Sequence, residues 1–231
     1  ATRRRESIFG DFLFAYHPDY AGTPSWYSSD QPYHIEGGDI LVLSAECVGI
    51  GISERTQAAG IDALAKRLLW AEPDSGVRRV LAFSLPHKRS FMHLDTVFTQ
   101  ADVDIFTVHP AILGTLTVFE LTRGARVGEV SIRQLDQTLD AILARALGLD
   151  GVRLIKCGGD DAIAAAREQW NDGSNTLAVR PGTVMVYQRN AVTNDILCCE
   201  GLNLLEVPSA ELSRGRGGPH CMSMAFWRED L

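Results

Sequence analysis

Several features that mark other classes of protein are missing from this sequence of 231 residues. It has no run of 18 apolar residues, so it predicts no membrane-spanning helix. It does not open with a basic stretch, an apolar core and a small-residue cleavage site, so it predicts no secretion signal. A net charge of −7 argues against binding to nucleic-acid phosphates. We therefore expect a cytoplasmic protein with no membrane and no nucleic-acid partner.

The cysteines are few, odd in number and irregularly spaced. The five do not form a CxxC pair, so neither a disulfide framework nor a zinc site is predicted, and no metal is expected. Cys47 and Cys157 lie in apolar stretches and are expected to be inert core thiols. Cys198 and Cys199 fall in a helical pattern, and at least one of them should be buried. Cys221 alone has an unusual setting.

What the chain does contain is a repeated unit of two strands, a helix and a closing strand. Such a repeat favours α/β propeller blades around a common axis over a Rossmann sheet. We expect a single catalytic domain over residues 1–231 with about three blades. The predicted elements are 40–43, 47–52, 56–70 and 79–83 in the first unit; 96–99, 104–108, 132–147 and 152–156 in the second, with an insertion at 111–130; and 176–179, 183–187, 192–199 and 202–207 in the third.

Helix signals support these ranges. In the helix at 56–70, five apolar residues recur at the spacing of one helical face: Ile61, Leu64, Ala65, Leu68 and Leu69. Ser131 and Gln134 resemble a capping box at the start of the helix at 132–147. Gly201 is a plausible C′ residue after the third helix.

Each unit opens at a polar corner: Glu36-Gly37-Gly38-Asp39, His93-Leu94-Asp95, and Asp172-Gly173-Ser174-Asn175. If rotation relates the units, the three corners converge on one site. Ordinary turn chemistry explains the first and third corners equally well. The second is not a turn signature. On a strand, His93 and Asp95 would share one face and could serve as acid/base and cation holder, although a buried structural histidine bonded to its neighbour is the alternative.

A glycine-rich loop at residues 213–221 ends at Cys221, and an apolar run follows at 222–227. Arg214, Arg216 and His220 place positive charge near the thiol. Such surroundings favour the thiolate, which is the nucleophilic form. A phosphate-binding Gly/Arg loop and a core cysteine at a strand start are the alternative interpretations of the same loop.

Taken together, these motifs resemble the arginine deiminase family. The similar stretches are the Glu36 and His93 corners (the latter as His-Leu-Asp-Thr), Gly-Ile-Ser-Glu-Arg-Thr at 51–56, Arg-Glu-Gln-Trp at 167–170 running on to the third corner, and Arg-Gly-Arg-Gly-Gly-Pro-His-Cys-Met-Ser at 214–223. They occur in order over nearly the whole chain and are most similar to actinobacterial members. The family fold is a five-bladed α/β propeller of guanidine-modifying enzymes, which agrees with the repeat.

The resemblance implies hydrolysis of free L-arginine to citrulline and ammonia without a metal or an organic cofactor. Cys221 would attack the guanidinium carbon, and His93 would protonate the departing ammonia and then activate water. Asp95 would accept two guanidinium hydrogen bonds. Glu36 would orient His93 and balance its charge.

The resemblance also implies residues that hold the substrate. Arg55 and Arg3 would bind the arginine carboxylate, and Arg216 would gate the site beside Cys221. Asp39 is expected among the substrate-binding residues.

One departure from the family concerns a second guanidinium carboxylate. Family members carry it in a Phe-Thr-Arg-Asp segment of their N-terminal blades, and no such segment occurs in this sequence. We therefore expect the chain to be the C-terminal part of the propeller. Its expected partners are the missing N-terminal segment or a second copy, and a homo-oligomer is expected.

Two other functions fit the same residues. Another guanidine-modifying enzyme, such as a dimethylarginine hydrolase or an amidinotransferase, would also use a cysteine, a histidine and carboxylates. A non-catalytic propeller used for binding is the alternative of a different class.

Overall fold

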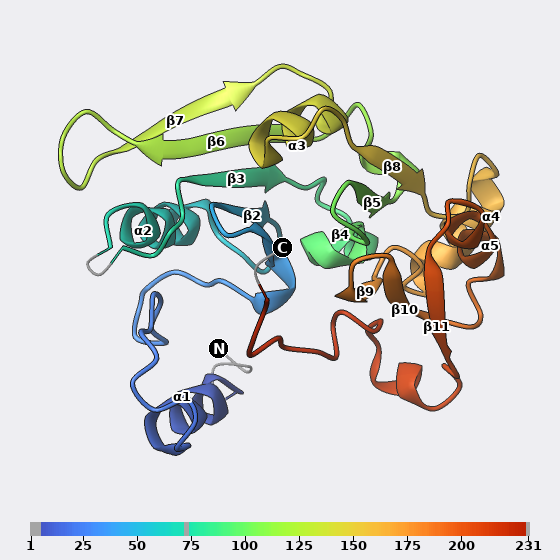
Figure 1. The fold of residues 1–231 in the computed structure, drawn as a ribbon, viewed down its shortest axis with the longest axis horizontal. Coiled ribbons are helices and arrows are strands. Elements are labelled where there is room, and N and C mark those ends of the chain that lie inside the picture. Colours follow the sequence, from blue (N-terminus) through green and yellow to red (C-terminus); the bar gives the residue numbers. More distant parts are fainter. Residues whose placement is uncertain (1–5, 72–73, 230–231) are drawn as a thin grey trace.

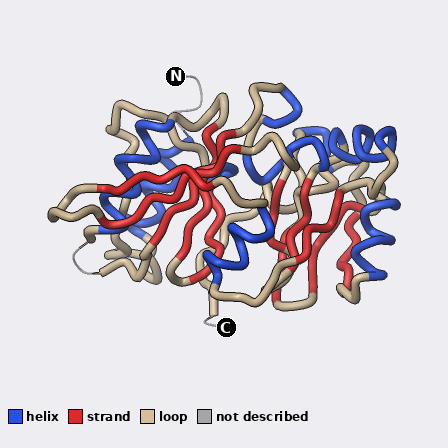
Figure 2. Tube along the Cα trace, turned by 90° about the horizontal axis from the view of Figure 1, so that it is seen from above, coloured by secondary structure: helices blue, strands red, loops and turns tan. Residues whose placement is uncertain are grey.

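The computed structural model describes residues 6–71 and 74–229. Within these ranges the strands form one sheet of five strands and two sheets of three. The sheets stand beside one another with helices packed on them (Figures 1 and 2). Each sheet contains an antiparallel pair followed by a parallel pair, so the predicted unit of two strands, a helix and a closing strand is confirmed three times.

The first unit forms the start of the five-stranded sheet. Its helix covers that sheet with the predicted apolar face, and Ile61, Leu64 and Leu69 pack there against Val48 and Ile50. Burial of each such side chain stabilises the fold by about 1.5–3 kcal/mol. The elements of this unit are β1 (Ile40–Ser44), β2 (Cys47–Ile52), α2 (Ala58–Leu69) and β3 (Arg79–Ser84).

The second unit differs from the prediction in its middle. Residues 130–135 form a strand rather than the start of a helix, and the helix begins only at Leu139. The predicted capping box is therefore wrong: Ser131 and Gln134 pair with Thr122 and Phe119 in a hairpin that extends the first sheet. This hairpin satisfies the backbone groups of the segment through strand pairing. The elements are β4 (Phe98–Gln100), β5 (Ile105–Val108), the hairpin strands β6 (Thr117–Arg123) and β7 (Val130–Leu135), α3 (Leu139–Leu147) and β8 (Arg153–Lys156).

The third unit follows the prediction closely. Gly201 has a φ of 90° directly after the C-cap Glu200, which confirms its place at C′. One helix between the second and third units was not predicted, because its sequence falls between two repeats. The elements are that helix, α4 (Ala162–Trp170), and then β9 (Leu177–Arg180), β10 (Thr183–Tyr187), α5 (Ala191–Cys199) and β11 (Asn203–Val207).

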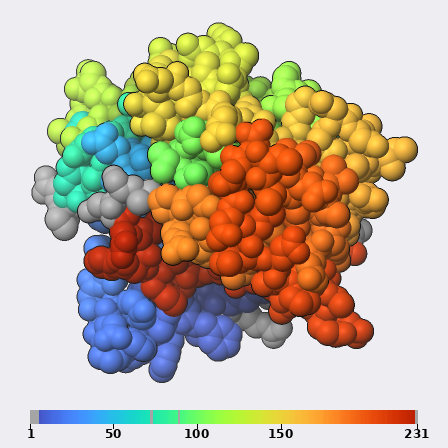
Figure 3. All heavy atoms as spheres, turned by 45° about the vertical axis from the view of Figure 1, so that its right-hand side comes forward, coloured from blue at the N-terminus to red at the C-terminus, as the bar shows by residue number. Residues whose placement is uncertain are grey.

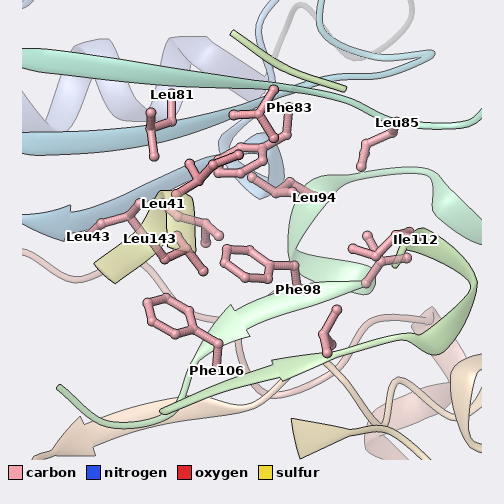
Figure 4. Close-up of a cluster of buried hydrophobic side chains, with 14 of the residues drawn as sticks. Leu41, Leu43, Leu81, Phe83, Leu85, Leu94, Phe98, Phe106, Ile112 and Leu143 are labelled. Atoms are coloured by element: carbon pink, nitrogen blue, oxygen red, sulfur yellow. The ribbon is translucent and has the colours of Figure 1, made fainter. Parts of the chain in front are cut away.

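A hydrophobic core joins the first two sheets. Figure 4 shows side chains from both units meeting there, with Phe98 lying between Phe83 and Phe106. Leu94, at the centre of the second corner, is fully buried in this cluster. Because Leu94 is anchored in the core, its two neighbours His93 and Asp95 are held at the inner edge of the sheets.

The two terminal segments of the described chain contact each other through aromatic side chains. Helix α1 (Ser7–Tyr16) has no buried residue. Phe226, near the other end, stacks on Tyr20 with ring centroids 4.8 Å apart. In Figure 3 the C-terminal tail, in dark red, lies between the blue N-terminal segment and the rest of the molecule. The apolar run at 222–227 is nevertheless exposed along much of its length.

Candidate active site

Hydrogen bonds connect the three polar corners and the glycine-rich loop. The backbone N–H of Leu94 donates to Asp39 Oδ1 over 2.8 Å, which joins the first corner to the second. Asn175 Nδ2 donates to the backbone oxygen of Asp95 over 2.8 Å, which joins the second to the third. The N–H of Cys221 donates to Asn175 Oδ1 over 3.0 Å. The predicted convergence of the corners is thus confirmed.

The second corner is not the strand that was predicted. Residues Leu94–Thr96 form a 3-10 turn, with His93 as its extended N-cap residue, and β4 begins only at Phe98. The prediction that His93 and Asp95 share one face of a strand is therefore wrong. The two side chains have separate partners, because the buried Leu94 between them fixes a turn instead of a pleat.

His93 pairs with the carboxylate of the first corner. Its Nε2 lies 2.8 Å from Glu36 Oε2, and Arg55 Nη1 lies 3.4 Å from Glu36 Oε1. Gly38 makes this approach possible: a Cβ there would lie 2.9 Å from the His93 ring. Glu36 is thus placed between a histidine and an arginine, and its two carboxylate oxygens hold both side chains at this corner.

Asp39 is buried, and both of its carboxylate oxygens accept hydrogen bonds from the protein. Its Oδ2 accepts from Ser53 Oγ over 2.7 Å, and its Oδ1 accepts from Leu94 N. Burial raises the pKa of Asp39, and hydrogen bonds from Thr56 and Ser53 oppose the rise. Its assignment to substrate binding stays a prediction, and these contacts favour a role in holding the two corners together.

Asp95 is equally buried, but only one of its carboxylate oxygens has partners among the described residues. Its Oδ2 lies 3.1 Å from His220 Nδ1 and 3.4 Å from Cys221 Sγ. Its Oδ1 is buried and has no hydrogen-bond partner among the described residues. A buried carboxylate oxygen without a donor is costly, and such atoms are common where a ligand binds.

The setting of the Cys221 thiol contradicts the expected positive surroundings. Desolvation, and then the negative charge of Asp95, raise the pKa of Cys221 to about 12. The arginines of the loop do not offset this: Arg216 is exposed, and Arg214 Nε pairs with Glu211 at 3.0 Å. Of the groups expected to be positive, only His220 lies at the site, and its Nδ1 is directed at Asp95.

The other predicted substrate-binding residues fall in different places. Arg55 is half-buried beside Glu36, and its Nη2 also contacts Met92 Sδ at 3.6 Å. Arg216 has a φ of 64°, in the left-handed region, at the loop beside the site. Arg3 lies outside the described residues.

Three residues at the site were quoted within motifs, but sequence reasoning gave Asn175 and Asp172 no role and gave His220 only that of placing positive charge near the thiol. Asn175 bridges Asp95 and Cys221, and His220 contacts the Asp95 carboxylate. Asp172, with a φ of 60°, accepts a hydrogen bond from Gly217 N. Burial, together with the charge of Asp95, raises the pKa of Asp172 to about 6. The available signal was their place in two of the motifs, the third polar corner and the glycine-rich loop.

The remaining cysteines divide differently from the prediction. Cys47 and Cys157 are buried, as expected, and burial raises the pKa of both thiols. Cys198 and Cys199 are both exposed, so the expectation that one is buried is wrong. They lie at the last turn of α5, where Leu197 is the residue that faces the core.

Among the described residues, no helix is both long and apolar enough to cross a membrane.

Solved structures of other proteins share this fold. The arginine dihydrolase ArgZ of cyanobacteria superimposes with a TM-score of 0.52 at 16% identity, over 84% of this chain and 24% of its own. The inosamine-phosphate amidinotransferase of Streptomyces griseus gives 0.52 at 15% identity, over 95% of this chain and 60% of its own. The fold is therefore the pentein-type α/β propeller.

Sequence relatives identify the family within that class. A family model described as arginine deiminase matches residues 1–228. Arginine deiminases of Treponema denticola and Clostridium perfringens are each 53% identical over 100% of this chain and 56% of their own length. The chain belongs to the arginine deiminase family, and it spans about half the length of the curated relatives it matches.

Proposed function

We propose that the protein hydrolyses the guanidinium group of L-arginine, giving citrulline and ammonia through a covalent amidino-cysteine intermediate. The observation that carries the proposal is Asp95: a fully buried carboxylate, beside the Sγ of Cys221, with one oxygen that has no partner in the part of the chain that the structure describes. A carboxylate of this kind favours a cation with several N–H donors. A guanidinium is planar and donates two parallel hydrogen bonds to a carboxylate.

Binding requires one rearrangement. His220 occupies Asp95 Oδ2 in this structure, and Asp95 is not exposed to solvent. A guanidinium therefore reaches both carboxylate oxygens when the His220 side chain turns away. The same event places a positive charge next to Cys221.

That positive charge activates the nucleophile. The thiol has a high pKa because it is desolvated and lies next to the negative Asp95. A bound guanidinium neutralises Asp95 and stabilises the thiolate directly. The thiol thus becomes most reactive when the substrate is in place, and it reacts more slowly with electrophiles that carry no positive charge.

The reaction then proceeds in two balanced halves. The Cys221 thiolate forms a bond to the guanidinium carbon, and the C–N bond to a terminal amino group breaks as His93 protonates the departing ammonia. His93 then removes a proton from water, whose oxygen bonds to the same carbon. The C–S bond then breaks as the added hydroxyl loses its remaining proton to solvent, which forms the C=O of citrulline and restores the thiolate. The Glu36 hydrogen bond would hold the His93 ring through both halves.

We assign binding of the other end of the substrate, which carries its carboxylate, to arginine side chains of the protein. Arg55 and Arg3 would bind its carboxylate, and Arg216 would close the loop over it. Arg55 is the best supported of these, because it is half-buried next to the His93–Glu36 pair.

The test measures citrulline and ammonia with L-arginine, methylated arginines and agmatine supplied in parallel. We expect arginine to be turned over fastest. Cys221→Ala should abolish turnover, whereas Cys198→Ala, which removes another exposed thiol, should leave it unchanged. Mass spectrometry should detect the amidino group on Cys221 after rapid quenching.

Faster turnover of a methylated arginine would assign the protein to another guanidine-modifying activity. Transfer of the amidino group to an added amine, in place of citrulline release, would indicate an amidinotransferase. The assay uses the native polypeptide with all of its residues.

We also propose a cytoplasmic location and a homo-oligomer. The exposed neighbouring thiols of Cys198 and Cys199 suit a reducing compartment. A guanidinium bound only by Asp95 would lack the second carboxylate of the family, at a cost of about 2–5 kcal/mol. We propose that this chain forms one catalytic domain and that the second carboxylate comes from an additional segment or a second copy. Sedimentation with and without arginine would test the assembly.

A further inference from the structure

The side-chain amide of Asn175 contacts the main chain of two other site residues at once. Its Nδ2 donates to the backbone oxygen of Asp95 over 2.8 Å, and its Oδ1 accepts from the N–H of Cys221 over 3.0 Å. Asn175 is 1% exposed. A single buried side chain thus joins the second corner to the loop of the nucleophile.

Both halves of the amide are needed for this bridge. Aspartate has no donor for the Asp95 carbonyl, and alanine leaves both backbone groups without a partner in a buried place. Gly218 lies against the same amide: a Cβ on Gly218 would be 2.7 Å from Asn175 Cβ and 2.8 Å from its Cγ. The loop therefore rests on Asn175 with no space between them.

We propose that Asn175 is a positioning residue that sets the separation between the Cys221 thiol and the Asp95 carboxylate. The inference rests on the proposed function, in which Asp95 holds the guanidinium that Cys221 attacks. The two atoms that it relates, Cys221 Sγ and Asp95 Oδ2, lie 3.4 Å apart. Reaction rates fall steeply when a nucleophile shifts by about 1 Å from its target.

The first experiment compares two alanine substitutions in one loop. Gly218→Ala inserts a methyl group against the Asn175 amide, whereas a Cβ on Gly215 would have no heavy atom within 4 Å. We expect Gly218→Ala to lower kcat for citrulline formation at least tenfold and Gly215→Ala to leave it within twofold.

The second experiment deletes the amide itself. Asn175→Ala is matched with Asn194→Ala, which removes a similarly buried asparagine whose Nδ2 donates to Tyr187 O. Both variants should lose stability. Only Asn175→Ala should also lose kcat in excess of its folded fraction, by about tenfold or more.

A readout that does not depend on turnover separates positioning from stability. Chloroacetamidine, an amidinium reagent, needs both Asp95 and the thiol, whereas iodoacetamide needs the thiol alone. The rate of alkylation of Cys221 by chloroacetamidine, divided by its rate with iodoacetamide, reports how the thiol and Asp95 are aligned. The exposed Cys198 and Cys199 give the same ratio for thiols without such a carboxylate, in the same sample. We expect the Cys221 ratio to fall about tenfold in Asn175→Ala and Gly218→Ala and to persist in both controls.

An unchanged ratio and kcat in folded Asn175→Ala and Gly218→Ala would overturn the positioning role. The proposed function fails by a different result, namely absence of citrulline from the native protein. In that case the alkylation ratio still decides whether Asn175 aligns the thiol with Asp95.

Discussion

The first and second corners each contain a fully buried aspartate, and the two aspartates differ in how their oxygens are used. Asp39 accepts hydrogen bonds on both oxygens, from Ser53 and from the backbone of Leu94. Asp95 shares one oxygen between His220 and Cys221, and its other oxygen has no partner among the described residues. Burial alone therefore does not distinguish a structural carboxylate from a functional one. The two kinds of carboxylate are distinguished by whether both oxygens have hydrogen-bond partners within the protein.

The comparison is tested most strongly by removing the charge of Asp95. Asp95→Asn should lower kcat/KM for arginine about a thousandfold, because the guanidinium loses a buried, charged hydrogen-bond partner. The thermal unfolding midpoint should change little, since few protein contacts depend on the charge. The readouts are citrulline kinetics and thermal unfolding. A large loss of stability with normal kinetics would reverse the roles of the two aspartates.

Asp39→Ala should show the opposite pattern. It leaves Ser53 Oγ and Leu94 N without their acceptor in a buried place, which should cost about 2–4 kcal/mol of unfolding free energy. Urea unfolding measures the loss, and activity per folded molecule at saturating arginine should be largely retained. If KM instead rises strongly while unfolding is unchanged, Asp39 contacts the substrate directly.

His220 also distinguishes the two aspartates, because it contacts the Asp95 oxygen that the substrate is proposed to use. His220→Ala should lower KM for arginine about tenfold with little change in kcat, since the guanidinium no longer displaces a charge-assisted hydrogen bond. His220→Asn, which keeps a side-chain donor, is the control and should have a KM nearer to that of the native protein. A higher KM in His220→Ala would show that His220 contributes to the bound state.

The smallest effect concerns Asp172, a third carboxylate at the site. Its pKa is raised from 3.8 to about 6, mainly by burial, so the folded state favours its protonated form. It therefore contributes stability below pH 3.8 that is lost as the pH rises through about 6. Asp172→Asn, which mimics the protonated form, should stabilise the protein by on the order of 1 kcal/mol at pH 7 and hardly at all near pH 4. Urea unfolding at both pH values measures this, and an equal gain at both would contradict the assigned cause.

Much of the fold could be predicted from local patterns. The bounds of β2 and β10 match the prediction, because continuous apolar runs between turn residues have few alternatives. The region before α3 could not be predicted in this way. Ile132 and Leu135 fit a helical pattern with Leu139, yet Ile132 is 56% exposed in a strand that pairs with β6. The strand pairing of Ile132 is made with Leu121, which lies outside the segment in which the helical pattern occurs. The local pattern therefore favoured a helix.

In the candidate site, too, local motifs predicted some features, whereas others depend on contacts between distant segments. The motifs identified the corners and the cysteine, but the inferred environment of Cys221 was wrong. Arginines near in sequence were expected to lower the thiol pKa, whereas the thiol lies against the buried Asp95, which is 126 residues away. Asn175 had no assigned role, because its two contacts are made with segments 46 and 80 residues distant.

Local motifs along the chain identified a nucleophile, a histidine and several carboxylates, and the repeat predicted that their corners meet. Which carboxylate is satisfied, which has an open oxygen, and what surrounds the thiol are visible only in the folded protein. This is because pKa values and hydrogen bonds depend on distances of a few ångströms and on the exclusion of water. Those distances are set by packing between units, and no spacing along the chain encodes them directly.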